Sequence, residues 1–345
     1  MPSVPFAGVA KPGWQFLKQY SKVKPKEAKL TVGVDIGSSA LKVVALGPKR
    51  ALGGRSVVGQ HLIELGESPE SHVVAALKET MSALHLSLKD VNLSVSGQWV
   101  IIRIVEMPAL KPDELKQALP FEAQRYLPFS TQDVVLDGAM LGPAETGKIW
   151  VLIVAAKRDL LERRIAWIKQ AGLEPAVIDV DALAVANAFV AGTSSGKLTG
   201  THALINVGAQ LTNLVIFKDE VPYLVRDIPW GGVKLLRNAA EQLGSDEAQI
   251  LAQLKPDGVV TQPLLDAMKV TTESLTVELQ LSFDFFESRF GPPPAELMVS
   301  GGMSQCPGFL DALKAHVAQT VTQWVPIEGL SSQFAVAYGL ALRSS

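Results

Sequence analysis

Cysteine and long apolar runs are nearly absent from this chain. Cys306 is the only cysteine in 345 residues, so no disulfide can form within the chain, and a reducing compartment fits best. Apolar stretches such as 150–156 are far shorter than the ~20 residues that a membrane-spanning helix needs. No apolar core of a signal peptide opens the sequence. We therefore expect a cytoplasmic protein.

The chain also lacks a surplus of charge of either sign. It has 32 Lys and Arg residues against 34 Asp and Glu residues, a formal net charge of -2 and an isoelectric point near 6.2. This balance gives no overall attraction to nucleic acid or anionic lipid, and we expect no nucleic-acid partner. The hydrophobic content of 48% allows a sizeable core, and the length suggests roughly two or three domains.

Residues 31–46 are the stretch around which the rest of the chain is organised. Two apolar segments, 31–36 and 40–46, predict strands joined by a turn of glycine and serines. An acid near the tip, beside uncovered backbone N–H groups, suits the Mg²⁺ and phosphates of a nucleotide. An ordinary hairpin with a turn-capping acid is the alternative. The expected nucleotide contacts are Asp35, Gly37, Ser38, Ser39 and Lys42. Asp35 is also the expected metal ligand.

The same pattern returns about 170 residues later, in 203–217. Again a strand runs to a polar residue, and a glycine-containing turn leads into a second strand. The repeat is more specific than either copy, because two hairpins facing each other across a cleft can hold β- and γ-phosphates from both sides. The expected nucleotide contacts in this hairpin are Asn206, Gly208, Ala209 and Gln210.

A third element lies near the end of the chain. The strand predicted before Gly301 runs into two glycines, where backbone can closely approach a flat base or ribose. Gly301, Gly302 and Met303 are therefore expected at the adenosine, with Cys306 as a small packing residue rather than a reactive thiol. The three segments resemble the phosphate-1, phosphate-2 and adenosine motifs of the actin and sugar-kinase superfamily. This resemblance implies an α/β, bilobed actin-like (ribonuclease H-like) ATPase fold with ATP and Mg²⁺ in the cleft.

Within that superfamily the chain resembles the PilM family of type IV pilus assembly proteins, relatives of the cell-division protein FtsA. The stretches that carry this resemblance are 35–39, 121–129, 226–232 and 334–342. It implies an FtsA/PilM-type inserted subdomain, nucleotide contacts at Gly231 and Gly232, and a scaffold at the inner face of the inner membrane. The implied partners are the cytoplasmic tail of a PilN-like membrane protein, other pilus assembly proteins and a second copy of the chain.

The resemblance and the order of the predicted elements divide the sequence into parts. The parts are an extension at 1–29, a first lobe at 30–98 and 173–202, an inserted subdomain at 99–172, a second lobe at 203–330, and a helix at 331–345 that returns to the first lobe. The extension is basic and aromatic, and is either a membrane-surface or partner-binding arm or a flexible lead sequence.

The inserted subdomain is expected to contain the partner site. Its helix predicted at 112–127 contains Pro120, which predicts a kink or a break. Leu127 and Phe129 are expected in the wall of a groove that holds the partner's tail, although packing in the core of the subdomain is the alternative. The remaining elements predicted here are strands at 100–105, 133–141 and 148–156 and a helix at 159–171.

Two departures from the family pattern bear on catalysis. Asn206 stands where relatives have Asp, and an amide brings no negative charge to offset Mg²⁺. Gln249 and Ala252 stand where relatives often have Glu and Lys for the nucleoside. Enzymatic activity therefore stays open, at most slow ATP hydrolysis with unknown catalytic residues. The alternatives are a sugar kinase, an FtsA-like polymerising tether and a type II secretion scaffold.

Overall fold

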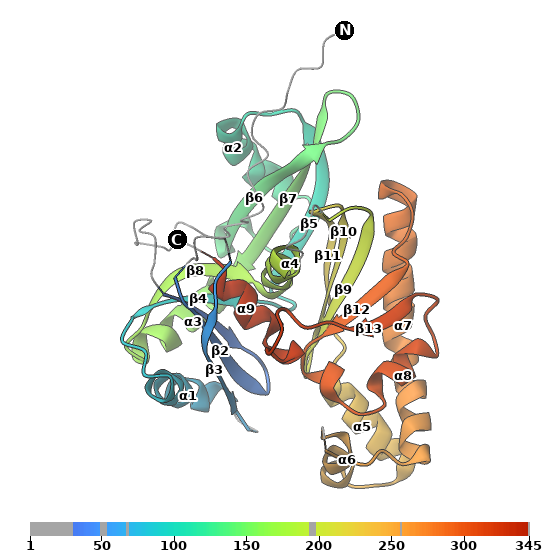
Figure 1. Ribbon diagram of the computed structural model, residues 1–345. Helices are drawn as coiled ribbons and strands as arrows, with labels where there is room; N and C mark the ends of the chain where they lie inside the picture. Colours follow the sequence, from blue (N-terminus) through green and yellow to red (C-terminus); the bar gives the residue numbers. More distant parts are fainter. Residues whose placement is uncertain (1–29, 49–53, 67–68, 193–197, 256, 344–345) are drawn as a thin grey trace.

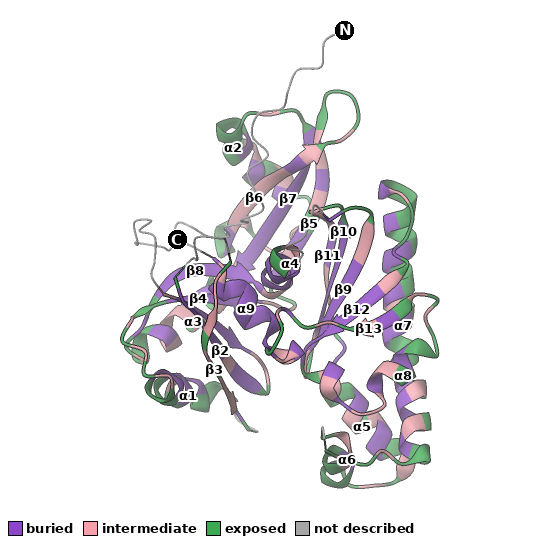
Figure 2. Ribbon diagram, viewed as in Figure 1, coloured by how far each residue is buried: buried purple, intermediate pink, exposed green. Residues whose placement is uncertain are grey.

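Two five-stranded sheets and a three-stranded sheet organise the described part of the chain (Figure 1). The computed structural model describes residues 30–48, 54–66, 69–192, 198–255 and 257–343. The predicted extension at 1–29 lies outside these residues. In Figure 2 buried residues follow the strands of the sheets, while exposed residues gather on the outer sides of helices such as α1 and α7.

The first sheet has the strand order β3-β2-β1-β4-β8. β1 and β2 form an antiparallel hairpin, and β4 and β8 continue the sheet parallel to β1. Every residue of β1 is buried, as expected for a central strand that is covered on both faces. The bounds are β1 Thr31–Ile36, β2 Ala40–Leu46, β3 Val57–Glu64, β4 Asp90–Val95 and β8 Glu174–Val180.

Different helices cover the two faces of this sheet. On β2, Val43 belongs to a cluster with Leu77 of α1 (Pro69–Ala83), whereas Val44 belongs to a cluster with Tyr338 of α9 (Ala335–Ala341). Successive side chains of a strand point to opposite faces. α1 therefore covers one face, and the C-terminal helix α9 covers the other.

The second sheet repeats the architecture of the first. Its order is β11-β10-β9-β12-β13, again with an antiparallel hairpin at the centre, a third antiparallel strand on one side and parallel strands on the other. This duplication confirms the bilobed actin-like fold that the resemblance implies. The bounds are β9 Thr201–Val207, β10 Thr212–Lys218, β11 Val221–Ile228, β12 Glu296–Ser300 and β13 Thr320–Gln323.

Helices also surround the second sheet. The longest described helix, α7, has 29 residues and packs against its neighbours through a buried side that includes Leu275, Leu279 and Phe286. None of the helices in the described ranges is long and apolar enough to cross a membrane. The bounds are α5 Gly232–Leu243, α6 Glu247–Leu254, α7 Gln262–Phe290 and α8 Phe309–Lys314.

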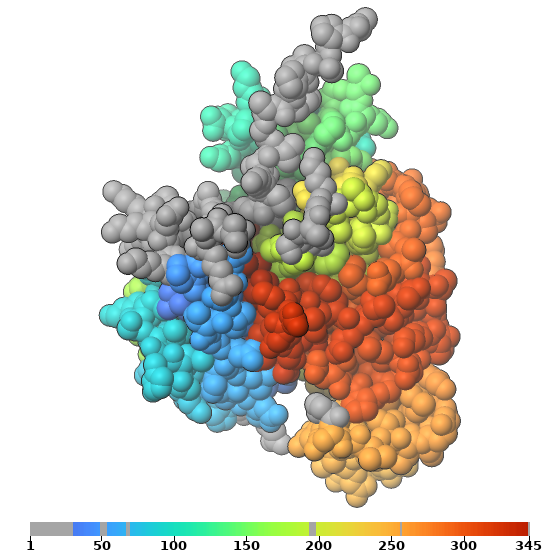
Figure 3. Space-filling view, in the orientation of Figure 1, coloured from blue at the N-terminus to red at the C-terminus, as the bar shows by residue number. Residues whose placement is uncertain are grey.

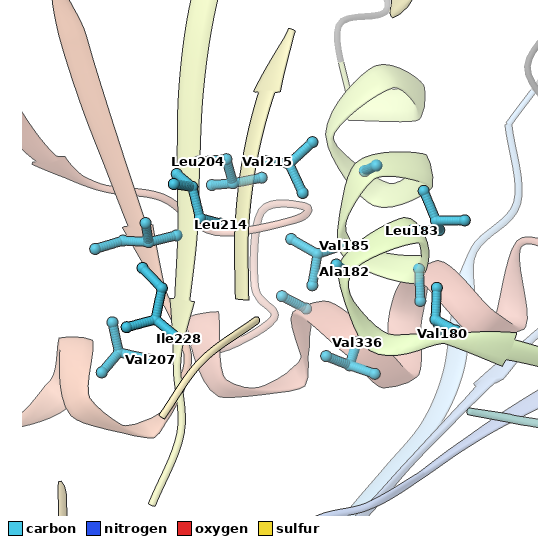
Figure 4. Close-up of a cluster of buried hydrophobic side chains, with 14 of the residues drawn as sticks. Val180, Ala182, Leu183, Val185, Leu204, Val207, Leu214, Val215, Ile228 and Val336 are labelled. Carbon is cyan, nitrogen blue, oxygen red and sulfur yellow. The ribbon is translucent and has the colours of Figure 1, made fainter. Parts of the chain in front are cut away.

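Two helices lie between the sheets and join the lobes. α4 (Asp181–Gly192) follows β8 of the first sheet and contacts β10 and β11 of the second, as well as α9. Its residues are buried nearly all round, which is typical of a helix enclosed by protein. Figure 4 shows Val185 of α4 and Val336 of α9 among side chains of both lobes, such as Val180 and Leu214.

The inserted subdomain has its own antiparallel sheet, in the order β5-β7-β6, and one helix, α2. α2 is not broken at Pro120, but it ends at Ala123 rather than at Leu127 as predicted. Leu127 precedes a proline, and that position disfavours helical backbone. The bounds are β5 Val100–Pro108, α2 Pro112–Ala123, β6 Val134–Pro143 and β7 Lys148–Lys157.

The helix α3 (Arg158–Gln170) packs differently from the prediction, which placed it in the inserted subdomain. Its buried residues Leu161 and Ile168 belong to the large core that includes both five-stranded sheets, and the helix contacts β8 and α1 of the first lobe as well as β7. The separate core of the inserted subdomain is made by β5, α2 and β7. α3 therefore links the inserted subdomain to the first lobe, because it begins directly after β7.

Candidate functional site

The first hairpin places Asp35 opposite Lys42 across its two strands. Lys42 Nζ lies 3.0 Å from Asp35 Oδ2, so a cation in the same hairpin balances this buried carboxylate. A Cβ at Gly37 would lie 2.9 Å from a carbonyl oxygen of the turn, which explains the glycine. Ser38 and Ser39 stay accessible at the tip.

The second hairpin holds Asn206 in a chain of side-chain hydrogen bonds. Asn206 Nδ2 donates to Asn213 Oδ1 at 3.1 Å, across the hairpin. Asn213 Nδ2 donates to Asp227 Oδ1 at 2.7 Å. The hydroxyl of Ser300 donates to Ile205 O at 3.1 Å and lies 3.4 Å from Asn206 Oδ1. The Asn206 amide is therefore held across the hairpin by Asn213.

Asp227 carries this chain of hydrogen bonds across to the other lobe. The residue lies on β11, and its Oδ2 accepts a hydrogen bond at 2.8 Å from the backbone N–H of Gly97, which follows β4 of the first sheet. Burial raises the pKa of Asp227, while the hydrogen bonds from Gly97 and Asn213 lower it. This contact ties the second hairpin, through Asn213 and Asp227, to the loop after β4 of the first lobe.

Asp181, at the start of α4, is a carboxylate that sequence reasoning missed. β1, β4 and β8 are parallel, so their carboxyl ends meet at one edge of the sheet, which is where Asp35 and Asp181 lie. The pKa of Asp181 is raised to about 6, first by burial and then by the negative charge of Asp35, while Ser94 and Ser96 lower it. An acid directly after a buried strand was the available signal.

Arg164 of α3 is a second residue that sequence reasoning missed. Its Nη1 donates to the backbone oxygen of Ile36 at 2.9 Å, at the end of β1. Burial lowers the pKa of Arg164, and the negative charges of Asp181 and Asp35 raise it. The edge of the first sheet thus combines two carboxylates with two cations, Arg164 and Lys42.

The turn at 208–211 of the second hairpin lies directly against the double glycine that opens α5. Gly232 N donates to Gly208 O at 3.0 Å. A Cβ at Gly231 would lie 2.5 Å from Ala209 O, so this approach requires glycine. Gln210 is exposed at the tip of the turn. The structure therefore brings together two groups of predicted nucleotide contacts.

The third predicted element joins the same place. Gly301 has a φ of 90°, and a Cβ there would lie 2.4 Å from Val207 O at the end of β9. A Cβ at Gly232 would lie 2.6 Å from Met303 Sδ, whereas one at Gly302 would meet nothing within 4 Å. The second lobe therefore offers backbone, free of side chains, next to the second hairpin.

The residues present fit a nucleotide with Mg²⁺. In the described part of the chain, no group of three or more His, Cys, Asp or Glu side chains could hold a metal ion. Mg²⁺ does not need such a group, because it keeps several waters and takes one or two carboxylates together with phosphates. Asp35 and Asp181 can supply the carboxylates, and Lys42 and Arg164 can attract phosphates.

Three further predicted positions lie near or beside the second lobe's glycines. Cys306 is buried, and burial raises the pKa of its thiol to about 12, so it packs rather than reacts. Gln249 and Ala252, on α6, are exposed.

In the space-filling view a notch opens at the lower end, between the blue atoms of the first lobe and the orange atoms of the α5–α6 region (Figure 3).

The sequence matches a known family over nearly its whole length. The profile of the family described as type IV pilus assembly protein PilM matches residues 33–345. A solved structure described as the PilM-PilN type IV pilus biogenesis complex is 24% identical, with a TM-score of 0.79 over 92% of this chain and 99% of that chain.

Two other solved structures share the fold at lower identity. The ethanolamine utilization protein EutJ from Carboxydothermus hydrogenoformans is 13% identical, with a TM-score of 0.56 over 93% of this chain and 92% of its own. A diol dehydratase-reactivating factor in nucleotide-free form is 9% identical, with a TM-score of 0.57 over 91% and 99%. At such identities the likeness concerns the fold alone.

Proposed function

Because the chain belongs to the PilM family of type IV pilus assembly proteins, we propose that it is a cytoplasmic, nucleotide-binding scaffold of the pilus assembly machine. ATP and Mg²⁺ bind between the lobes, and the cytoplasmic tail of a PilN-like inner-membrane protein binds the first lobe and holds the scaffold at the membrane. The observation that carries the nucleotide part is the chain of hydrogen bonds that runs from Asn206 of the second hairpin through Asn213 and Asp227 to Gly97, at the edge of the first sheet where Asp35 and Asp181 lie.

In this proposal Asp35 is the main acid on the metal side, with Asp181 as a second carboxylate. Lys42 now pairs with Asp35 and would turn to the phosphates once the metal takes over that carboxylate. The phosphates are enclosed by the turn of each hairpin, and the open space at Gly302, where a Cβ would meet nothing within 4 Å, receives the adenosine. Bound ATP supplies the phosphate oxygens that complete the coordination of Mg²⁺.

Hydrolysis is slow at most in this proposal. Asn206 adds no charge, and its amide donates to Asn213, so it neither neutralises a metal nor accepts a proton. Asp181 is an acid with a raised pKa, which suits a group that takes a proton near neutral pH. Asp227, the acid of the second lobe, accepts hydrogen bonds from Gly97 and Asn213 and so holds the lobes together, which favours holding ATP over turning it over.

The partner's tail is proposed to bind where the inserted subdomain meets the first lobe. Leu127 is half-buried against the core of the subdomain, and Phe129 is half-buried with Lys157 Nζ 5.8 Å from its ring centre. The same Nζ lies 4.5 Å from the ring centre of Trp99, whose exposed fraction is 43%. Partly exposed aromatic rings beside a cation suit an extended peptide with apolar side chains.

The nucleotide part is tested by titrating the protein with ATP, in the presence and absence of Mg²⁺, in a calorimeter. Asp35→Ala should reduce the gain in ATP affinity that Mg²⁺ gives by about tenfold or more, because the metal loses its main protein ligand. Asp90→Ala is the control, since Asp90 is exposed at the far end of the neighbouring strand β4. An unchanged Mg²⁺ effect in Asp35→Ala would refute the assignment.

A further inference from the structure

Arg164 reaches from α3 into the first phosphate hairpin. Besides its hydrogen bond to Ile36 O, its guanidinium carbon lies 5.2 Å from the centre of the Trp167 ring, on the same helix. The neighbouring Arg163 instead points outward and pairs with Glu70 at the surface, at 2.9 Å. One of two adjacent arginines thus contacts the candidate nucleotide site, and the other does not.

The beginning of α3 is fixed to the inserted subdomain. Arg158, its first residue, donates from Nε to Gln132 O at 2.8 Å, and Gln132 lies in the short helix Thr131–Asp133 before β6. The preceding residue, Lys157, donates from its backbone N–H to Trp99 O at 3.1 Å. A single helix therefore contacts the inserted subdomain at its first turn and the hairpin at Arg164.

The charges around Arg164 change when a metal nucleotide binds. Without a ligand, Lys42 and Arg164 balance Asp35 and Asp181. Mg²⁺ adds two positive charges beside these cations and repels Arg164, while the phosphates attract it. The guanidinium contacts Ile36 O of the hairpin and the ring of Trp167 on its own helix. A displacement of the guanidinium would therefore also move α3.

We propose that Arg164 is a positioning residue through which nucleotide binding and the arrangement of the inserted subdomain depend on each other, with α3 as the link. The inference rests on the proposed function, since it adds a regulation to the same nucleotide site. Coupling of this kind is reciprocal. If a ligand of the inserted subdomain changes the affinity for Mg²⁺-ATP by some factor, Mg²⁺-ATP changes the affinity for that ligand by the same factor.

The test compares the full chain with Arg164→Met, Arg164→Lys and the matched control Arg163→Met. Amide hydrogen exchange is measured with and without Mg²⁺-ATP at saturation, together with calorimetric affinity. In the wild type and Arg163→Met, Mg²⁺-ATP should slow exchange both in the hairpin at 31–46 and in the inserted subdomain at 99–157. In Arg164→Met affinity should fall about tenfold, and at saturation only the hairpin should be protected.

Arg164→Lys keeps the charge and should regain most of the affinity and part of the protection, which a purely structural role would not give. It also carries the test if Arg164→Met does not fold. Protection of the inserted subdomain in Arg164→Met equal to the wild type would overturn the inference. Protection of the hairpin alone in the wild type would overturn it too. In both cases the nucleotide still binds, so the proposed function is not affected. A wild type that shows neither heat nor protection with Mg²⁺-ATP overturns the proposed function itself.

Discussion

Asn206 and Asp181 show how single side chains set the chemistry between the lobes. Asn206 is neutral and donates to Asn213, whereas Asp181 is an acid that burial first and then the negative charge of Asp35 make harder to ionise. The acid that the second hairpin lacks is thus offset in part by one at the end of β8. A divalent cation near Asp35 would lower the pKa of Asp181, because it favours the ionised form.

The raised pKa of Asp181 predicts a dependence of stability on pH. The folded pKa is about 6 against a usual value of 3.8, so the folded state binds more protons between these values and loses stability as the pH rises through them. Asp181→Asn removes this loss. Without Mg²⁺, the difference in free energy of unfolding between the variant and the wild type should rise in favour of the variant by up to about 3 kcal/mol from about pH 4 to pH 7.

Urea unfolding of both proteins across this range measures the difference. Asp311→Asn, on the surface of α8, controls for the loss of a carboxylate as such. Adding Mg²⁺-ATP should shrink the advantage of the variant, since the ligand stabilises the ionised wild-type side chain. A difference between Asp181→Asn and the wild type that does not change with pH would contradict the assignment of the raised pKa.

At the scale of elements, close packing of α4 and α9 holds the centre of the molecule. Gly339 of α9 faces the backbone of α4, where a Cβ would lie 1.8 Å from Ala184 O. Gly33 of β1 faces α9 in the same way, where a Cβ would lie 2.0 Å from Ala337 O. These contacts leave no room for a methyl group, so the two helices can approach the sheet and each other only through glycine.

Gly339→Ala should therefore lower the free energy of unfolding by about 3 kcal/mol or more, because backbone atoms must move apart to admit the Cβ. Gly302→Ala is the matched control, since a Cβ at Gly302 meets nothing within 4 Å and its φ is not in the left-handed region. Chemical denaturation followed by circular dichroism measures both. Equal stability of the two variants would show that α4 and α9 separate more easily than their packing indicates.

The elements also show what the sequence could predict. The hairpin at 31–46 was predictable in its bounds, because alternation between apolar strands and a Gly-Ser turn is a local signal. The end of α2 and the packing of α3 were not, since Pro128 and the first sheet compete with the helical pattern. Asp181 was missed because its role depends on strand order, which brings the ends of β1, β4 and β8 together.

For the whole molecule, the two lobes were predicted from the resemblance of the repeated hairpins and the glycine pair to the actin and sugar-kinase superfamily, and the structure repeats the sheet around each hairpin. The connections between the lobes were beyond the sequence. They include α4 and α9 between the sheets and the hydrogen bond from Gly97 to Asp227, residues separated in the chain and joined only by the fold. Nucleotide binding at this junction would act on both lobes at once.

The two ends of the inserted subdomain leave the first lobe at one place, and Trp150 of its strand β7 also packs against Tyr223 and Phe290 of the second lobe. Trp99 and Lys157 are hydrogen bonded at 3.1 Å, so the two ends of the subdomain lie side by side. Replacing 100–156 with a short Gly/Ser linker should remove the subdomain while keeping α3 and both hairpins. Removal up to 172, the predicted boundary, would also delete the part of the core that Leu161 and Ile168 form with the first sheet.

The shorter deletion should abolish binding of a synthetic peptide with the sequence of a PilN-like protein's cytoplasmic tail, which we expect to bind the intact chain with micromolar affinity before membrane tethering. Mg²⁺-ATP should still bind the variant, because Asp35, Asp181 and the glycines of the second lobe stay in place. Fluorescence anisotropy of the labelled peptide measures the first effect, and calorimetry with ATP measures the second and serves as the control for folding. Peptide binding that survives in a variant that still binds ATP would place the partner site outside the inserted subdomain, since no other part of the proposed site is removed.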